Sequence, residues 1–330
     1  MRPLIVESDS QPGRHCSRVA AGLLNPVRGR GAPKLVWRSE EMAHTARAHY
    51  DNVALHIGRR VFHPTPILRH PAPEVQASGH SLKRGGAPAG KTLSERFPGS
   101  SPDKPLLVRC GGWLDTATYI DSTRMFFRER GCYFNETYSE CDTKFGASVH
   151  DGVRWRDYRA KALIVAAGLG ARELPSFSSL PFRAAAGRIA EIEPPSPILS
   201  DEIHVFDGHW LIKRSGGPHL CGATYEFVDP ESVPNEFPDE LRPLTNRILG
   251  PAWACSHIRI GVRPILRQSR PLAGRHPRIP SLAWLNGLGS RGVSTAPRVA
   301  AALLEHLLLG AELDPEFDAM RCRHVHQFLQ

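Results

Sequence analysis

The segment NGLGSRGVSTAP, residues 286–297, contains three glycines within six positions and leads into an apolar run. Gly287, Gly289 and Gly292 allow the backbone to adopt a positive φ or to approach a flat ligand closely. A helix that begins behind such a loop presents free N–H groups and a partial positive charge. The segment therefore predicts either a site for a ligand that gains negative charge or a joint whose glycines serve only packing.

The residues around this loop predict a strand before it and a helix after it. The segment HIRIGVRP, residues 257–264, is a strand pattern that places Arg263 near its end. The run rich in leucine and alanine at residues 299–308 predicts a helix that stops at Gly310. Pro297 is expected in the first turn of that helix, where a missing N–H is tolerated.

The composition is that of a soluble globular protein. The chain has 330 residues, of which 41% are hydrophobic and 23% charged, enough for one large domain or two intertwined ones. No run approaches the roughly 18 apolar residues of a membrane span. Residues 1–9 have only a short apolar core and do not form a signal peptide pattern. We therefore expect a cytoplasmic protein that has no membrane partner.

The charged and metal-ligating residues do not form a recognisable cluster. The net charge of +9 comes from scattered basic residues, which indicates a solvated surface or attraction for an anionic ligand, and nucleic acid is not expected as a partner. The seven cysteines are irregularly spaced without a CxxC pair, so neither a zinc ribbon nor a disulfide framework is indicated. Cys322, His324 and His326 lack a fourth ligand nearby, and no metal site is expected.

The first half of the chain predicts strands and helices of an α/β protein. A strand at residues 3–7 ends in an acid, and a helix over residues 39–57 begins with an acidic first turn. Another helix is predicted from residue 115 or 116 to residue 131. The run KALIVAAG, residues 161–168, is the clearest strand of the chain. A continuous apolar strand of this kind is typical of a parallel sheet whose carboxyl end meets a ligand.

Residues 185–260 favour an antiparallel sheet distinct from the parallel one. The pattern predicts strands at 187–192 and 219–226, a hairpin at 203–213 with an Asp-Gly turn, and a helix at 240–249. Residues 71–105 mix Pro, Gly, Ser and basic residues with little periodicity, which predicts a flexible surface insertion.

Several short motifs occur along the chain in one order. They are the strand that ends at Glu7, segment 17–26, the glycine pair 111–112, the strand end 166–168, segments 187–189, 222–224, 261–264 and 274–277, and the loop 287–297. Each motif is weak alone, but the set resembles the FAD-dependent D-amino-acid oxidase and glycine oxidase family over nearly the whole chain except 71–105.

The resemblance implies an α/β fold in which a Rossmann-like FAD-binding domain is interleaved with an antiparallel-sheet α+β substrate domain. It assigns residues 1–45, 105–180 and 267–330 to the FAD-binding domain, and residues 46–104 and 181–266 to the substrate domain. The implied cofactor is FAD, and the implied substrate is a small amino acid or related amine. The oligomeric state is left open.

The resemblance also implies where FAD is bound. Glu7 resembles the acid that binds the ribose hydroxyls of the adenosine half. The stretch that faces the flavin would be Ser17, Arg18, Ala20, Ala21 and Gly22, and Ala167 and Gly168 would pass close to the dinucleotide. The backbone N–H groups of Gly287, Leu288, Gly289, Ser290 and Gly292 would meet the pyrimidine edge of the flavin, where the helix dipole favours negative charge.

Arg263 resembles the arginine that pairs with the substrate carboxylate, a task suited to the planar guanidinium fork. Its alternative role is a structural salt bridge. Arg291 is a second candidate, and Tyr225 and Trp253 are either pocket aromatics or core residues. The implied reaction is hydride transfer from the substrate α-carbon to flavin N5, which needs no protein base if the amine enters neutral.

One expected unit of the family is absent from the sequence. The family opens with a strand and a Gly-x-Gly-x-x-Gly loop that binds the FAD pyrophosphate, and roughly 25–30 residues before Glu7 would be needed to supply it. The absence leaves three hypotheses: a flavoenzyme whose gene is truncated here, a degenerate member that binds FAD weakly or not at all, and an oxidase of the tRNA-modification type.

Overall fold

The computed structural model describes residues 2–8, 16–28, 34–35, 39–71, 105–148, 150–194, 200–214, 217–227, 232–266 and 271–321. The predicted insertion at 71–105 therefore lies almost wholly outside the described residues, and the predictions for Cys322, His324 and His326 lie outside them too. None of the helices in the described part combines the length and apolar character that a bilayer span requires.

Two small parallel ladders form the first layer of the fold. Strand β1 (Ile5–Glu7) pairs in parallel with β9 (Tyr133–Asn135), as the apolar run that ends in an acid predicts. Strand β13 (Leu163–Val165) pairs in parallel with β20 (Leu282–Asn286), which also pairs antiparallel with β19 (Leu272–Arg275). The expected strand at 161–168 is thus present, with a ladder of three residues.

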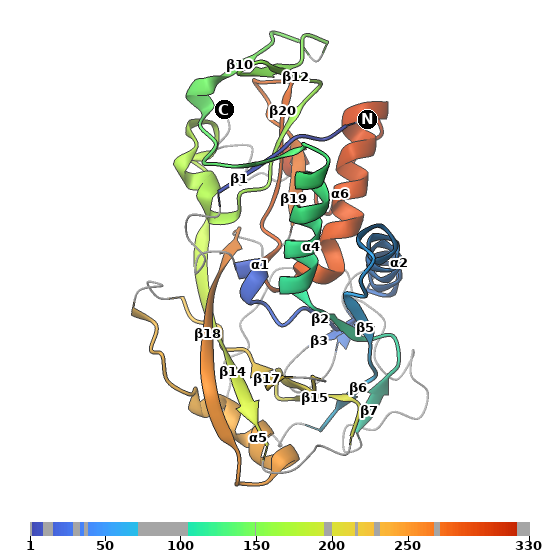
Figure 1. Ribbon diagram of the computed structural model, residues 1–330, viewed down its shortest axis with the longest axis vertical. Helices are drawn as coiled ribbons and strands as arrows, with labels where there is room; N and C mark the ends of the chain where they lie inside the picture. The colour runs from blue at the N-terminus through green and yellow to red at the C-terminus, as the bar shows by residue number, and fades with distance from the viewer. Residues whose placement is uncertain are drawn as a thin grey trace.

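Three helices pack beside these ladders, and Figure 1 shows them on one side of the molecule. Helix α2 spans Ser39–Ile57, α4 spans Thr116–Glu129 and α6 spans Gly292–Leu309. Each predicted helix is confirmed. Helix α4 starts where expected because the side chain of Asp115 accepts a hydrogen bond from the N–H of Thr118.

The prediction for Pro297 is wrong, because α6 begins at Gly292 and Pro297 lies inside the helix. A proline there has no N–H for the carbonyl four residues earlier, which belongs to Val293. The hydroxyl of Tyr50 on α2 donates to that carbonyl at 2.8 Å and supplies the missing bond. Tertiary packing of α2 on α6 therefore permits a helix that the local sequence opposes.

A seven-stranded sheet forms the second layer, in the order β18-β14-β17-β16-β15-β6-β7. Its neighbours are antiparallel except for β15 and β6. The strands are β6 (Ile67–Arg69), β7 (Leu106–Val108), β14 (Arg183–Glu193), β15 (Ile203–Phe206), β16 (His209–Ile212), β17 (His219–Gly222) and β18 (Ala254–Ile265). The predicted Asp-Gly hairpin is confirmed, since Asp207 and Gly208 both have positive φ between β15 and β16.

Shorter elements join the two layers. Small sheets contain β2 (Leu23–Leu24), β5 (Phe62–Pro64) and β8 (Gly112–Leu114); β3 (Val27–Arg28) and β4 (Lys34–Leu35); and β10 (Thr143–Phe145), β11 (Val153–Trp155) and β12 (Tyr158–Ala160). In the described part of the chain, the remaining helices are α1 (Cys16–Val19) and α5 (Arg242–Leu249), with 3-10 turns η2 (Glu140–Asp142), η3 (Gly168–Glu173), η4 (Pro175–Phe177), η6 (Asp239–Leu241), η7 (Gly289–Arg291) and η8 (Ala319–Arg321).

The expected domain division stays a prediction. Helix α2 crosses the boundary expected between residues 45 and 46, and it packs against α6. Strand β7 joins the seven-stranded sheet, although it lies in the segment 105–180. The two layers are therefore more interleaved than the predicted segments.

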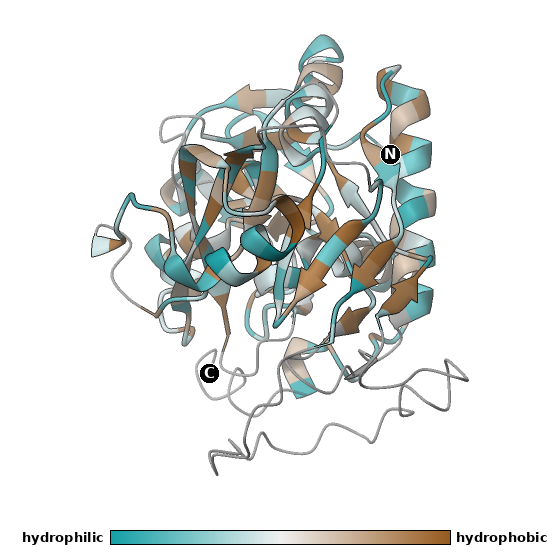
Figure 2. Ribbon diagram, turned by 90° about the horizontal axis from the view of Figure 1, so that it is seen from below, coloured by the Kyte–Doolittle hydropathy of each residue, from teal (hydrophilic) through white to brown (hydrophobic). Residues whose placement is uncertain are grey.

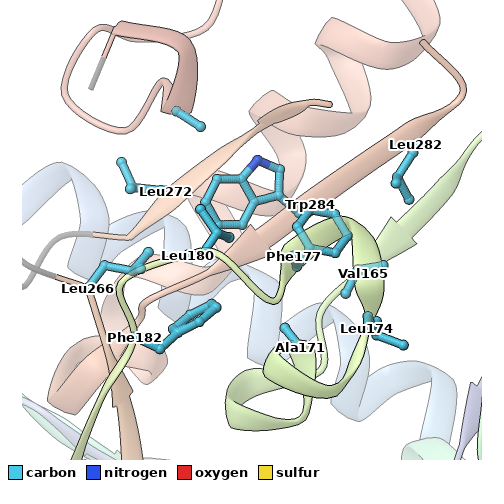
Figure 3. Close-up of a cluster of buried hydrophobic side chains, with 11 residues drawn as sticks. Val165, Ala171, Leu174, Phe177, Leu180, Phe182, Leu266, Leu272, Leu282 and Trp284 are labelled. Carbon is cyan, nitrogen blue, oxygen red and sulfur yellow. The ribbon is translucent and has the colours of Figure 1, made fainter. Parts of the chain in front are cut away.

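The core is divided among several clusters rather than gathered in one. Figure 3 shows Trp284 of β20 packed among Phe177, Leu180 and other apolar side chains from the segment after β13. Figure 2 shows apolar residues concentrated on the strands, whereas the outer faces of the helices are largely hydrophilic. A second cluster, around Ile67, Val205 and Ile212, fills one face of the seven-stranded sheet. The first cluster therefore belongs to the layer of β13, β19 and β20, and the second to the seven-stranded sheet, of which β18 is an edge strand.

Candidate functional site

Three segments that are far apart in the sequence meet at the last five residues of β18. Helix α1 lies beside this strand in Figure 1, and a Cβ added to Gly261 would lie 3.3 Å from the side chain of Val19. The turn η3 approaches through Gly168, whose added Cβ would lie 3.8 Å from Pro264. The turn η7 also contacts β18. The predicted site segments are therefore neighbours in space.

Arg263 projects from this end of β18 and is mostly buried. Its Nη1 donates to the backbone carbonyls of Ala186 and Thr224, both at 3.2 Å. The guanidinium carbon lies 5.2 Å from the centre of the Tyr225 ring, a cation–π distance. These contacts fix the position of the charge without neutralising it.

The guanidinium of Arg263 fits beside β14 because Gly187 has no side chain. A Cβ added to Gly187 on β14 would lie 2.6 Å from Cζ of Arg263, which is closer than real Cβ atoms approach other heavy atoms. Gly187 pairs with Gly261 across the two long strands. The glycine of segment 187–189 is therefore needed for a close approach and not for an unusual backbone angle.

No carboxylate among the described residues forms an ion pair with Arg263, so the predicted alternative of a structural salt bridge has no partner there. Burial lowers the pKa of Arg263 from its ordinary value, an effect that nearby Tyr225 and Cys16 oppose. Burial raises the pKa of the Cys16 thiol, so this group stays neutral and is no counterion. A buried, permanent and unneutralised guanidinium is a strong site for an external anion.

The stretch expected to face the flavin is held against α4 and β8. The Thr116 hydroxyl donates to the Ala20 carbonyl at 2.6 Å, and the Leu114 N–H donates to the Gly22 carbonyl at 3.0 Å. Ala21 is buried and Gly22 has a φ of 72°. Small residues therefore occupy a position where a side chain on Gly22 would collide with Leu114.

The other two residues of this stretch differ from one another. Ser17 is exposed, whereas Arg18 forms an ion pair with Asp121 of α4. Arg18 therefore fastens α1 to α4 in the described structure. A direct contact of either side chain with a flavin stays a prediction.

The strand end at Ala167 and Gly168 is joined to the glycine loop by one side chain. Gly168 has a φ of 56°, and its carbonyl accepts a hydrogen bond from Nδ2 of Asn286 at 2.9 Å. The other end of the same amide, Oδ1, accepts from the N–H of Gly287 at 2.8 Å. Asn286 is buried and is a positioning residue that the sequence interpretation missed.

In the loop before α6, the N–H of Gly287 is bonded to Asn286 and that of Arg291 to the Leu288 carbonyl, so the other N–H groups of the loop are the candidate donors. Gly287 and Gly289 have φ values of 73° and 55°, and nothing lies within 4 Å of a Cβ added to Gly289. The residue that precedes α6, Arg291, makes no side-chain capping bond. Open space beside uncapped N–H groups at a helix start suits an electron-rich ligand edge. Leu288, Ser290 and Gly292 lie in this same loop and helix start, as predicted.

Glu7, the residue predicted to bind the ribose of the adenosine half of FAD, already has protein partners. Arg124 donates to both carboxylate oxygens at 2.8 and 2.7 Å, and the Tyr133 hydroxyl donates at 3.1 Å. These bonds already take up much of the acceptor capacity of the carboxylate. Arg124 was missed in the sequence because its partner lies 117 residues away. A ribose bond to Glu7 stays a prediction that must share this carboxylate.

The aromatic candidates separate clearly. Tyr225 lies against Arg263 and is 42% exposed, so it belongs to the site surface. Trp253 packs against Phe237 and donates to Oδ1 of Asn246, on the α5 side of the sheet.

Arg291 contributes its backbone carbonyl to bonds from Ser294 and Thr295. Among the described residues no group of three metal-ligating side chains gathers.

The residues present fit an isoalloxazine ring better than they fit an adenosine. Small residues, open space at Gly289 and a helix start without a side-chain cap lie at the predicted flavin end, whereas the expected ribose acid is engaged. A parallel layer is joined here to an antiparallel sheet, and Arg263, which has no carboxylate partner among the described residues, lies on β18, which η3 and η7 also contact. The chain belongs to the FAD dependent oxidoreductase (DAO) family, whose profile matches residues 1–306.

Solved structures share this fold at low sequence identity. Iminodiacetate oxidase from Chelativorans sp. BNC1 is 18% identical with a TM-score of 0.69, covering 96% of this chain and 92% of that one. Glycine oxidase from Geobacillus kaustophilus is 16% identical with a TM-score of 0.66, covering 95% and 90%. The fold class and the FAD cofactor predicted from the resemblance are thus confirmed.

One curated relative is similar over part of the chain. The tRNA 5-methylaminomethyl-2-thiouridine biosynthesis bifunctional protein MnmC of Shewanella pealeana is 27% identical over 180 residues. The match covers 43% of this chain and 28% of that protein. The chain therefore spans much less than the full length of this relative.

Proposed function

We propose that the chain oxidises a small amino or imino acid whose carboxylate binds to Arg263. The observation that supports this proposal is a buried guanidinium that has no carboxylate partner among the described residues. Around it lie three segments that the resemblance assigns to the FAD site. FAD, when bound, supplies the acceptor for a hydride from the substrate α-carbon.

The residues of this chain would bind and orient the substrate. Carbonyl bonds to one nitrogen of Arg263 leave the rest of the fork for a carboxylate, which prefers two parallel N–H donors. Tyr225 would cover the guanidinium and exclude water, so the ion pair would form in a low-dielectric setting. The loop at Gly287–Gly292 would stabilise negative charge on the cofactor edge.

Anaerobic reduction of the bound flavin tests this proposal. The purified chain is loaded with FAD and mixed with glycine, N-methylglycine or D-alanine, and loss of the flavin absorbance is followed. Arg263→Leu should slow reduction by at least about a hundredfold while the flavin content stays unchanged, since a charge-assisted bidentate contact is lost. Arg263→Lys should give an intermediate rate because it keeps the charge and loses the fork.

Two outcomes would contradict the proposed function. If Arg263→Leu reduces as fast as the parent protein, Arg263 is not the carboxylate anchor. If the chain takes up no added FAD, the degenerate, non-catalytic hypothesis is supported instead.

A second candidate function is oxidation of an aminomethyl-carboxylate group on a modified tRNA base. The partial similarity to the tRNA-modifying relative favours it, and the net charge of +9 is compatible with an RNA partner. The same Arg263 could bind the carboxylate in either case. Faster flavin reduction by tRNA that carries this group than by any free amino acid would support the second candidate.

A further inference from the structure

A second arginine shares the sheet face of Arg263. In the register of β14 and β18, Arg263 is opposite Ala185 and Arg183 is opposite Ile265. Residues directly opposite one another project to the same side, and so do alternate residues along one strand. Arg183 and Arg263 are therefore diagonal neighbours on one face.

Two aromatic rings lie between these arginines. The bridge between Ala186 and Glu226 places Tyr225 and Phe227 on the same face as the arginines. The rings meet edge to face with their centres 5.3 Å apart. Cζ of Arg263 lies 5.2 Å from the Tyr225 ring, and Cζ of Arg183 lies 4.2 Å from the Phe227 ring. The result is a continuous row of guanidinium, ring, ring and guanidinium.

No acidic side chain among the described residues neutralises the pair on this face. Glu226 lies on the opposite face, where it bonds Arg188 at 3.1 Å. Glu191 shares the face but is already paired with Arg259. Among the described residues, Arg183 forms no ion pair with a carboxylate, and neither does Arg263.

Two like charges on one face of the sheet repel one another, and an anionic ligand that contacts both relieves that repulsion. A single carboxylate at Arg263 would leave Arg183 without an anion. We propose that Arg183 binds a second carboxylate, so that the preferred substrate is an amino or imino acid with two carboxylates a few atoms apart. This inference rests on the proposed role of Arg263.

A matched pair of ligands tests the inference without turnover. Iminodiacetate and N-ethylglycine have similar shapes, and they differ in that one carries a second carboxylate where the other carries a methyl group. Binding of each to the purified chain, whose bound flavin is first reduced so that it cannot accept a hydride, is measured by titration calorimetry in the absence of oxygen. The proteins compared are the parent, Arg183→Gln, Arg263→Leu and Arg242→Gln. Arg242 is the control, because it also lies over aromatic rings but on α5, away from the site.

The parent and the Arg242→Gln control should bind iminodiacetate at least about tenfold more tightly than N-ethylglycine, the preference expected for one charge-assisted contact. Arg183→Gln should remove that preference by weakening iminodiacetate alone, and Arg263→Leu should weaken both ligands. Equal binding of the two ligands by the parent, or an unchanged preference in Arg183→Gln, overturns the inference and leaves the role of Arg263 intact. If Arg263→Leu weakens neither ligand, the proposed function fails and the inference fails with it.

Discussion

Replacing Gly187 by alanine should displace the guanidinium of Arg263 without changing any charge. The added Cβ would lie 2.6 Å from Cζ of Arg263, so the guanidinium must move, and it can do so because it is the end of a flexible side chain. Gly187 lies in the regular strand β14 and has no positive φ. The backbone should therefore accept alanine, and the effect should fall on Arg263.

The magnitude follows from the bonds that the displacement breaks. Arg263 donates to the carbonyls of Ala186 and Thr224, and a shift away from Gly187 would lengthen both 3.2 Å bonds and turn the fork. A bond that involves a charged group contributes about 1.5–3 kcal/mol, and loss of one to the substrate corresponds to roughly 10- to 150-fold in affinity. The free energy of unfolding should change little, because glycine to alanine in an unstrained strand contributes about 0.4–1 kcal/mol of stability.

The assay compares Gly187→Ala with Gly217→Ala, a glycine whose added Cβ would meet nothing within 4 Å. The apparent KM for a small amino acid should rise at least about tenfold in Gly187→Ala and stay unchanged in the control. Flavin absorbance and the thermal midpoint are recorded for both proteins. A KM for Gly187→Ala equal to that of the parent would refute the inference that Arg263 needs this space to bind substrate.

Three further outcomes follow from contacts elsewhere in the fold. Tyr50→Phe should lower the free energy of unfolding by about 1–3 kcal/mol in urea titration, because the partly buried Val293 carbonyl loses its donor; an unchanged midpoint would contradict this. The pKa of His70 is lowered to about 4, mainly by burial and then by the neighbouring His204. The neutral imidazole stabilises the fold, and this contribution is fully present above about pH 6.5. The free energy of unfolding should therefore fall as the pH drops from about 6.5 towards 4. In His70→Phe the thermal midpoint should depend less on pH between about 6.5 and 4 than in the parent protein. An equally steep dependence would contradict the assigned role of His70. Gly22→Ala should give a protein with a markedly lower melting midpoint, since φ is 72° there and the added Cβ would collide with a backbone carbonyl.

Elements with strong local signals were predictable from the sequence. Helix α2 matches its predicted range of 39–57 because its acidic first turn marks where the helix starts. The turn at Asp207-Gly208 is set by residues that tolerate positive φ. Pro297 was misplaced because the hydroxyl that permits α6 to continue comes from a helix more than 200 residues away. Local sequence rules predict where a helix starts and ends, but a contact from a distant helix can allow a proline inside it.

The site was predictable only as a set of separate segments. The glycine loop, the strand end and Arg263 were all found, and the structure brings them together at β18. Whether Arg263 has a counterion depends on strand register and on partners from β14 and β17, which no local pattern reports. Arg124 and Arg183 were missed for the same reason: an arginine on a helix or strand has no sequence signal that distinguishes it from a solvated one.

The two ends of the proposed cofactor site differ in whether existing protein contacts must break before FAD can bind. At the predicted flavin end, the chain supplies small residues, open space beside Gly289 and a helix start without a side-chain cap. At the adenosine end, Glu7 is bonded by Arg124, which in turn lies 3.8 Å from Asp121, the partner of Arg18. A ribose that binds Glu7 must therefore compete with a network that also fastens α1 to α4. Because breaking a partly buried ion pair costs more than displacing water, we expect the flavin ring to contribute more than the adenosine to the affinity of this chain for FAD.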